Sequence, residues 1–368
     1  MTLPPRTKHE IATPALLVDV DRLDANISVM ARHLAARGRR FRPHGKTHKC
    51  PAIARRLIAA GAVGICAAKL GEAEVFADAG IPGLLVTTAV VGERKIGRAV
   101  ALALSAPDTI FCVDDPGNVR AMSAAAEAGG VTVKLAVDLY FGRTGILPGE
   151  PAASLARLID SLPNVCFAGL QAYDSSASHV LDVDARRAQT TTNMRAAVHT
   201  KGAIEASGIE CALLSGGSTG TYFVDADIDG ITELQPGSFV FMDVDYRRVG
   251  GSDQAPARAF APALTVLTTI VSRQEKSAIV DGGYKAFSTD RPFPPEPIDL
   301  IGAAYTWAGD EHGRLDLTAA ERDVKVGDRV EFIPPHCDPT VNLYDRIYAL
   351  RGDLVEDIWP IAARGRSD

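Results

Sequence analysis

Short apolar runs alternate with longer helical patterns along the first two thirds of the chain. Ala- and Leu-rich stretches separate these runs, and in one of them, at 115–128, an aspartate and a proline stand where helix N-termini favour them. This alternation is typical of βα units that build a parallel sheet. Eight such units predict an α/β fold closed into a (β/α)₈ (TIM) barrel rather than an open sheet. The predicted strands are 40–44, 64–68, 83–87, 109–113, 131–137, 165–172, 210–215 and 230–234.

The pattern changes after about residue 236. The runs at 238–244, 263–272 and 277–280 are strand-like, they are interrupted by Gly, Pro and Asp, and no convincing amphipathic helix accompanies them. The sequence therefore predicts that the barrel is followed by a C-terminal all-β domain.

The N-terminal residues are expected to join this second domain. A strand at 15–19 precedes the first predicted barrel helix at 21–37, so the first twenty residues have no place in the barrel itself. We predict a barrel domain at residues 21–236 and a β-rich domain formed by residues 1–20 and 237–368.

The composition is that of an ordinary globular protein, with 46% hydrophobic and 23% charged residues in a chain of 368. The net charge is −6 and the cations are dispersed, so nucleic acid is not an expected partner. No apolar run reaches the roughly 18 residues that span a bilayer, and no signal peptide is recognisable, so no membrane association is expected. The six cysteines are far apart and mostly in apolar segments, which is typical of reduced thiols in a cytoplasmic protein.

The first predicted barrel strand leads into Lys46, which stands among Arg42, His44, His48 and Lys49. An amine acts as a nucleophile only when it is deprotonated, and the neighbouring cations are expected to lower the pKa of Lys46 toward working pH. Lys46 is therefore a candidate Schiff-base lysine. The simpler interpretation is a solvated charge in a basic loop.

Other candidates follow later strands, because catalytic groups in a (β/α)₈ barrel come from the C-terminal ends of the strands. Arg143 follows the fifth predicted strand, and Tyr173 and His179 follow the sixth. Glycines and hydroxyls after the seventh strand expose backbone N–H groups before a short helix, which suits a phosphate, although an ordinary turn is the alternative. The residues of this segment are Ser215, Gly216, Gly217, Ser218 and Thr219.

A second candidate site lies near the C-terminal end, at His336 and Asp338. Two residues apart in an extended segment, these side chains point to the same side and could bind one metal ion, with Cys337 facing away. An imidazole and a carboxylate suit Mn²⁺ or Mg²⁺ better than a pair of thiolates does, and Zn²⁺ is also compatible.

The segment Arg-Pro-His-Gly-Lys-Thr-His at 42–48 resembles the D-threonine aldolase and D-serine dehydratase family of fold-type III pyridoxal-phosphate (PLP) enzymes, relatives of alanine racemase. The segments at 61–74, 169–173, 336–338 and 358–365 also resemble that family, so the resemblance covers nearly the whole chain. It implies that Lys46 carries PLP, that Arg143 and Tyr173 lie beside the cofactor, and that the loop 215–219 holds its phosphate. Tyr140 departs from the family's Asp-x-Gly-x-x-Arg-x-Gly pattern, which has glycine there.

The resemblance also implies a reaction. The metal on His336 and Asp338 would bind the β-hydroxyl of a D-3-hydroxy amino acid, His179 would be the base, and the products would be glycine and an aldehyde. The dehydratase branch resembles His-x-Cys at the metal pair, so Asp338 favours the aldolase branch, of D-threonine or 3-hydroxy-D-aspartate type.

Two alternatives remain: a dehydratase acting on D-serine or 3-hydroxyaspartate, and a non-catalytic PLP carrier. Arg247, Arg291 and Lys285 are cations that could meet a side-chain carboxylate of the substrate. Relatives usually form homodimers, so a homodimer is expected.

Overall fold

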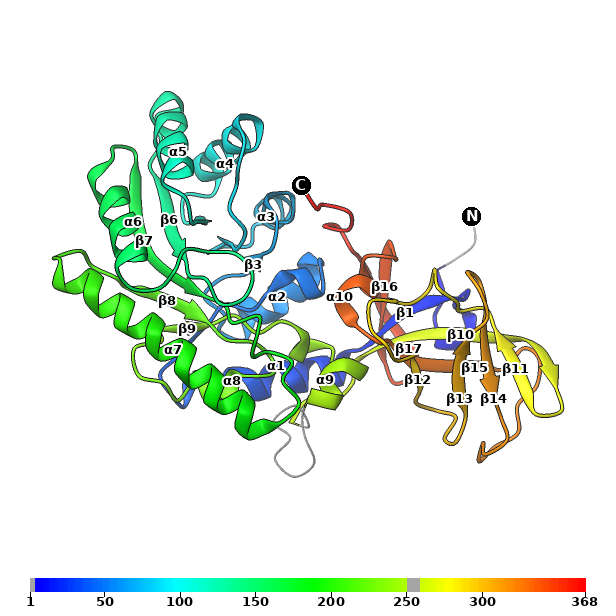
Figure 1. Cartoon of the computed structure of the whole chain (residues 1–368). Helices are drawn as coiled ribbons and strands as arrows, with labels where there is room; N and C mark the ends of the chain where they lie inside the picture. Colours follow the sequence, from blue (N-terminus) through cyan, green and yellow to red (C-terminus); the bar gives the residue numbers. More distant parts are fainter. Residues whose placement is uncertain (1–3, 250–258) are drawn as a thin grey trace.

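The computed structural model describes residues 4–249 and 259–368, which form a barrel of parallel strands and a mostly β domain beside it (Figure 1). Each of the eight predicted barrel runs overlaps one strand of an eight-stranded sheet with the order β2-β9-β8-β7-β6-β5-β4-β3. These strands are β2 (Arg40–Phe41), β3 (Cys66–Ala67), β4 (Leu85–Val86), β5 (Ile110–Val113), β6 (Val133–Asp138), β7 (Val165–Ala172), β8 (Leu213–Gly216) and β9 (Glu233–Leu234).

The two ends of this sheet meet. A parallel bridge joins His44, just after β2, to Cys66 of β3, and the Cys66 N–H donates to the carbonyl of Pro43 over 2.9 Å. All pairs of neighbouring strands in the sheet are parallel. The predicted (β/α)₈ barrel is thus confirmed.

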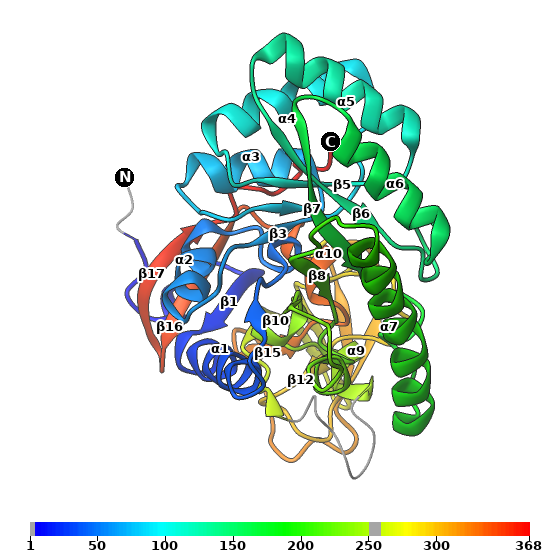
Figure 2. The same cartoon turned by 90° about the vertical axis from the view of Figure 1, so that its left-hand side faces the viewer.

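Helices lie outside these strands, as the view from the barrel side shows (Figure 2). Their starts follow local capping chemistry: Asp115 accepts a hydrogen bond from the Asn118 N–H over 2.8 Å, and Pro116 occupies the first turn. The helices are α1 (Val20–Ala35), α2 (Pro51–Ala59), α3 (Leu70–Asp78), α4 (Glu93–Ser105), α5 (Pro116–Gly129), α6 (Glu150–Ser161), α7 (Val183–Ala206) and α8 (Tyr222–Asp225). Across residues 4–249 and 259–368, no helix has the length and apolar character needed to cross a membrane.

The second sheet has nine strands and includes the N-terminal strand. In it β1 pairs antiparallel with β10 and parallel with β16. The limits of the two domains at residues 20/21 and 236/237 stay a prediction. The strands are β1 (Ala15–Asp19), β10 (Leu264–Gln274), β11 (Ser277–Val280), β12 (Glu296–Pro297), β13 (Ala304–Trp307), β14 (Gly313–Asp316), β15 (Arg329–Ile333), β16 (Arg346–Arg351) and β17 (Leu354–Pro360).

The expected strand at 238–244 is wrong. This segment forms a 3₁₀ turn, η3 (Ser238–Val240), and then enters the helix α9 (Val244–Val249). Met242 has a φ of +52°, which is incompatible with an extended strand, and Asp243 accepts a hydrogen bond from the Tyr246 N–H over 2.9 Å at the start of α9. With a second short helix, α10 (Cys337–Val341), the C-terminal domain is mostly β rather than all β.

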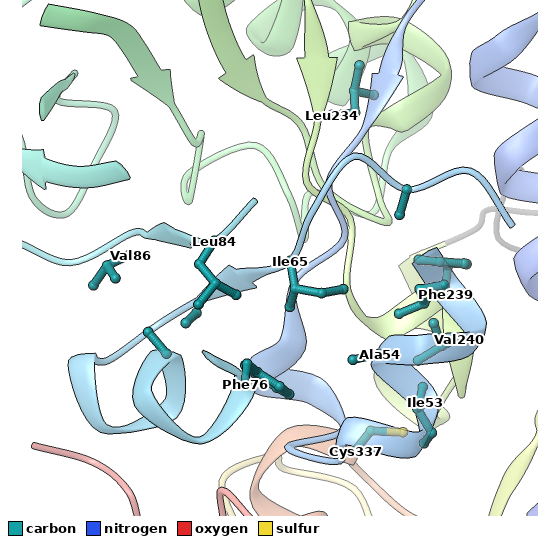
Figure 3. Close-up of a cluster of buried hydrophobic side chains, with 14 of the residues drawn as sticks. Ile53, Ala54, Ile65, Phe76, Leu84, Val86, Leu234, Phe239, Val240 and Cys337 are labelled. Atoms are coloured by element: carbon teal, nitrogen blue, oxygen red, sulfur yellow. The ribbon is translucent and has the colours of Figure 1, made fainter. Parts of the chain in front are cut away.

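One apolar core continues from the barrel to α10. Figure 3 shows Ile53 and Ala54 of α2, Phe76 of α3 and Phe239 of η3 in one cluster with Cys337, and all five are buried. Because α10 is anchored in this core, the segment that bears His336 and Asp338 is held against the barrel.

Candidate active site

Lys46 lies directly after β2, in the 3₁₀ turn η2 (Gly45–Thr47). The turn packs tightly, since a Cβ atom at Gly45 would come within 2.6 Å of the Phe76 ring, so only glycine fits there. The Lys46 side chain lines a cavity of about 390 Å³ at the C-terminal ends of the barrel strands. This is the place where barrel enzymes carry their chemistry.

Several predicted residues line the same cavity, namely Lys46, Arg143, Tyr173, Ser218 and Thr219. The Arg143 guanidinium lies 5.2 Å from the centre of the Tyr173 ring, so the two side chains stack as a cation–π pair on one wall. The loop bearing Arg143 closes through a hydrogen bond from the Tyr140 N–H to the Ile146 carbonyl over 2.9 Å. The loop thus tolerates tyrosine at the position where the family has glycine.

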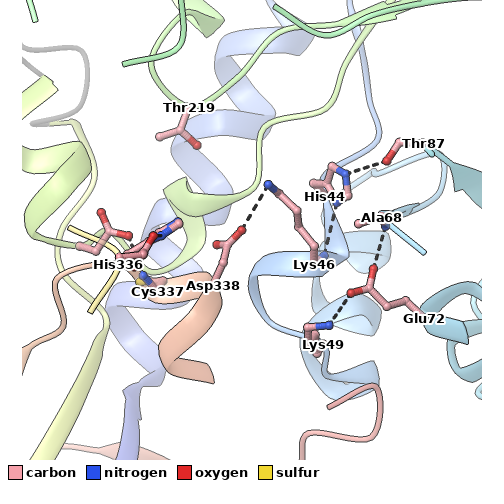
Figure 4. A network of polar contacts seen from close by, with 12 residues as sticks. His44, Lys46, Lys49, Ala68, Glu72, Thr87, Thr219, His336, Cys337 and Asp338 are labelled. Atoms are coloured by element: carbon pink, nitrogen blue, oxygen red, sulfur yellow. Dashed lines mark hydrogen bonds and ion pairs between the residues drawn. The ribbon is translucent and has the colours of Figure 1, made fainter. Parts of the chain in front are cut away.

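The environment of Lys46 differs from the one expected. Its ammonium group lies 3.4 Å from Asp338 Oδ2 (Figure 4), and this carboxylate is the main reason why the pKa of Lys46 is raised rather than lowered. The neighbouring cations Arg42 and Lys49 are paired with buried Glu233 and Glu72, over 2.8 and 2.5 Å. The expectation that they lower the pKa of Lys46 is wrong, because their charges are already compensated.

The loop after β8 offers fewer free N–H groups than its sequence suggests. The Ser218 N–H donates to Thr221 Oγ1, and the Gly220 N–H donates to Ser218 Oγ, over 3.1 and 3.2 Å. Within the described residues, the Thr219 N–H has no such partner. Ser215, Gly216 and Gly217 are not among the residues that line the cavity.

The sequence did not lead us to a second segment of the cavity wall. Gly237, which precedes η3, and Ser238, the first residue of η3, line the cavity together with Ser218 and Thr219, and we call these four residues the cradle. A Cβ atom at Gly237 would lie 2.6 Å from Thr47 Oγ1, so the backbone approaches closely only because the residue is glycine. A Gly-Ser pair after the eighth barrel strand was the signal that could have pointed to it. Two loops facing one cavity with hydroxyls and N–H groups fit a phosphate group.

His336 and Asp338 do not lie in an extended segment, as had been expected. His336 is the N-cap of α10, and Asp338 stands in the first turn of that helix. The His336 Nδ1 contacts Asp290 Oδ2 over 2.7 Å, which leaves Nε2 for another partner. Asp338 Oδ1 is buried and has no hydrogen-bond partner among the described residues. An unpartnered buried carboxylate oxygen next to an oriented imidazole fits a divalent cation.

Within the described parts of the chain, His336 and Asp338 are the two candidate side-chain ligands of such a cation. Among residues 4–249 and 259–368, no group of three or more His, Cys, Asp and Glu side chains could hold a metal ion. Cys337 is fully buried, and burial raises the pKa of its thiol well above the usual value, so it does not supply a thiolate. Any ion here would therefore complete its coordination with substrate or water.

His179 lies outside the cavity lining, on the loop after β7. Its Nδ1 is 3.2 Å from Asp245 Oδ2, and its ring packs on Tyr246 with 4.9 Å between ring centres. Tyr246 itself lines the cavity. The His179 imidazole is thus separated from the cavity by Tyr246, and its Nε2 has no hydrogen-bond partner among the residues that the structure describes.

The three cations considered for a substrate carboxylate are all paired with acidic side chains. Arg291 contacts Asp245 and Asp290, Arg247 contacts Glu296 over 2.6 Å, and Lys285 contacts Glu311 over 2.6 Å.

Known proteins match both parts of the chain. The family model "Alanine racemase, N-terminal domain" matches residues 18–245, and a serine dehydratase domain model matches residues 263–350. The chain is 35% identical to the 3-hydroxy-D-aspartate aldolase of Paracoccus denitrificans, over 99% of this chain and 95% of that protein. The chain belongs to the alanine racemase-like family of D-threonine aldolases and D-serine dehydratases.

Solved structures of this family share the whole fold. The crystal structure of D-threonine aldolase from Filomicrobium marinum superposes with a TM-score of 0.95 at 37% identity and covers all of both chains. The D-threo-3-hydroxyaspartate dehydratase of Delftia sp. is 30% identical, over 94% of this chain and 96% of that protein. Membership in this family of PLP enzymes agrees with the lysine and the two-loop cradle at the cavity.

Proposed function

We propose that this protein is a PLP- and divalent-metal-dependent lyase that cleaves D-3-hydroxy amino acids, of D-threonine or 3-hydroxy-D-aspartate type, into glycine and an aldehyde. The observation that carries the proposal is the 3.4 Å distance between Asp338 Oδ2 and the Nζ of Lys46, a residue that lines the cavity. Lys46 follows a barrel strand and Asp338 belongs to α10, after the second sheet's β15. The candidate cofactor lysine and a candidate metal ligand therefore meet at one point.

The proposed roles follow from these positions. Lys46 would hold PLP through its amine, Arg143 and Tyr173 would flank the ring, and the cradle would hold the phosphate. His336 Nε2 and Asp338 Oδ1 would hold the metal. When bound, PLP withdraws electrons from the substrate Cα, and the metal lowers the pKa of the β-hydroxyl.

His179 is the proposed base. Its Nδ1 faces the Asp245 carboxylate, which stabilises the protonated imidazole, so Nε2 is the atom that would accept the β-hydroxyl proton. After loss of that proton, the electron pair of the O–H bond would form the C=O bond of the aldehyde as the Cα–Cβ bond breaks. The electron pair left on Cα would then take up a proton to give glycine.

The dehydratase is the second candidate, because a dehydratase is among the relatives. In that reaction Lys46 would take the Cα proton and the hydroxyl would leave. A hard carboxylate, Asp338, and no accessible thiolate beside it support the aldolase and a preference for Mn²⁺ or Mg²⁺ over Zn²⁺. A non-catalytic PLP carrier would not need the metal pair.

We further propose a cytoplasmic homodimer. All six cysteines are unpaired, which suits a reducing compartment. The homodimer is proposed because members of the resembled family usually form homodimers.

Product analysis tests the proposal. Purified protein with PLP and Mn²⁺ is incubated with D-threonine, 3-hydroxy-D-aspartate or D-serine, with L-threonine as a stereochemical control. Glycine plus an aldehyde from a D-substrate is the expected result. A 2-oxo acid plus ammonia would establish the dehydratase, and no turnover would favour the carrier.

A further inference from the structure

Arg291 lies between two aspartates near the candidate active site. Its Nε donates to Asp245 Oδ2 over 2.7 Å, and its Nη1 donates to Asp290 Oδ2 over 3.0 Å. The guanidinium carries fixed donors pointing in different directions, so it can hold two carboxylates in a defined relation to each other.

Each of these aspartates contacts one imidazole of the site. Asp290 Oδ2 lies 2.7 Å from His336 Nδ1, and Asp245 Oδ2 lies 3.2 Å from His179 Nδ1. The first contact is aligned as a hydrogen bond, whereas the second has the distance of an ion pair without that alignment. A continuous series of contacts therefore runs from His179 through Asp245, Arg291 and Asp290 to His336, and we call it the Arg291 ion-pair chain.

The Arg291 ion-pair chain joins segments that are far apart in sequence. His179 follows β7 of the barrel, Asp245 lies on α9, and His336 caps α10. Arg291 lies between β11 and β12 and is only 25% exposed, while Asp245 is 13% exposed, so water screens these contacts less than it screens a surface pair. Without the guanidinium, the two carboxylates would repel each other and draw the imidazoles apart.

We propose that Arg291 is a positioning residue that fixes the relative positions of two imidazoles. It holds the proposed metal-binding imidazole of His336 through Asp290, and it holds the imidazole of His179 through Asp245. The inference rests on the proposed function for the roles of the two histidines. It adds that Arg291 is already engaged with two carboxylates and serves the site by geometry rather than by binding substrate. Outer partners of metal ligands typically change metal affinity by about 10- to 100-fold when they are removed.

The variant Arg291→Met tests this proposal, because it keeps most of the side-chain volume and removes the donors. Arg247→Met is the matched control: Arg247 also joins α9 to the β-rich domain, through Glu296 at 2.6 Å, but its partner contacts neither imidazole. Mn²⁺ affinity is measured by titration of the PLP-loaded protein without substrate, together with PLP absorbance and thermal stability. We expect Arg291→Met to bind Mn²⁺ at least about 10-fold more weakly while retaining PLP.

Two further variants keep the test informative if Arg291→Met unfolds. Arg291→Lys retains the positive charge but lacks the planar set of N–H donors, so it should recover part of the Mn²⁺ affinity that Arg291→Met loses. Asp290→Asn should weaken Mn²⁺ binding although Arg291 is intact. The proposal is overturned if Mn²⁺ affinity stays within twofold of wild type, if Arg247→Met loses as much, or if the wild-type protein binds no Mn²⁺. Because binding is measured without substrate, an Arg291 effect on Mn²⁺ in a protein that lacks aldolase activity would refute the proposed reaction and leave the positioning role standing.

Discussion

Lys46 is the residue on which the cofactor assignment depends. We expect the protein with PLP to show a visible absorption band that borohydride reduction fixes, and peptide mapping to place the label on Lys46. Lys49 is an unsuitable carrier because it is buried against Glu72 and is not among the residues that line the cavity, whereas Lys69 lines the cavity and is the realistic competitor. The variant Lys69→Ala should therefore keep the label, and a label found on Lys69 or Lys49 would contradict the assignment.

Asp225 gives the fold a predictable pH dependence. The side chain is buried next to Gly217 in the loop after β8, and burial raises its pKa from 3.8 to about 7. Because the folded protein then binds the proton more tightly than the unfolded chain, the free energy of unfolding falls as pH rises from about 4 to about 7. Asp225→Asn has no carboxyl group to ionise at this position, so this decrease should be absent. The difference in the free energy of unfolding between the variant and the wild-type protein should therefore be larger, in favour of the variant, at pH 8 than at pH 5.

The expected gain is a few kcal/mol, at about 1.4 kcal/mol per pKa unit. Urea unfolding at the two pH values measures it, with Asp184→Asn on the exposed surface as the control for loss of one charge. Equal differences at both pH values would show that Asp225 is ionised without penalty in the folded protein.

At the scale of residues, the sequence predicted which side chains line the cavity better than it predicted the charged groups that each of them contacts. Lys46, Arg143 and Tyr173 were found by their places after barrel strands, and the structure brings them to one cavity. The charge around Lys46 could not be predicted, because Asp338 is 292 positions away in the chain and reaches the amine only through the packing of α10. Sequence neighbours such as Arg42 proved to be neutralised by a distant partner.

At the scale of elements, the loop after β8, which contains Gly217, Ser218 and Thr219, gives a direct test of the proposed phosphate site. Gly217 has a φ of +78°, and a Cβ atom there would lie 3.0 Å from Asp225 Oδ2. Gly217→Val should therefore shift the loop and weaken PLP binding, which a titration of PLP absorbance measures. Gly208→Val is the control, because Gly208 has a φ of +88° with open space around it and lies at the end of α7. Unchanged PLP affinity in a folded Gly217→Val protein would exclude the loop from the site.

The hydrophobic pattern was enough to predict the barrel strands and the long helices. The strands are buried on both faces and appear as short continuous apolar runs, whereas each long helix buries one face. The pattern failed at 238–244, where the apolar residues are buried by a 3₁₀ turn and a short helix rather than by a strand. The same failure affected His336 and Asp338, which were expected in an extended segment and belong to the start of α10. Short helices of this kind are set by caps and tertiary packing, to which periodicity is blind.

At the scale of the whole molecule, the two proposed cofactors are held by different parts of the chain. The barrel supplies Lys46 and the loop after β8, whereas His336 and Asp338 come from the segment after β15. Removal of the metal should therefore leave PLP in place. We expect chelation, or the variant His336→Ala, to abolish aldehyde formation while the visible absorption band of PLP persists, because the loss of one of two protein ligands costs most of the metal affinity.

The identity of the metal follows from the same arrangement. Asp338 presents a hard carboxylate oxygen, so Asp338→Cys should shift the preference from Mn²⁺ toward Zn²⁺, measured by competition between the two ions for the PLP-loaded protein. Cys337→Ser is the control, because that thiol is buried among apolar side chains and should leave the preference unchanged. Full activity of the wild-type protein after exhaustive chelation, or an Asp338→Cys variant with unaltered metal preference, would remove the metal from His336 and Asp338. Lys46 would then face the Asp338 carboxylate as a simple ion pair across the interface between the two parts of the molecule.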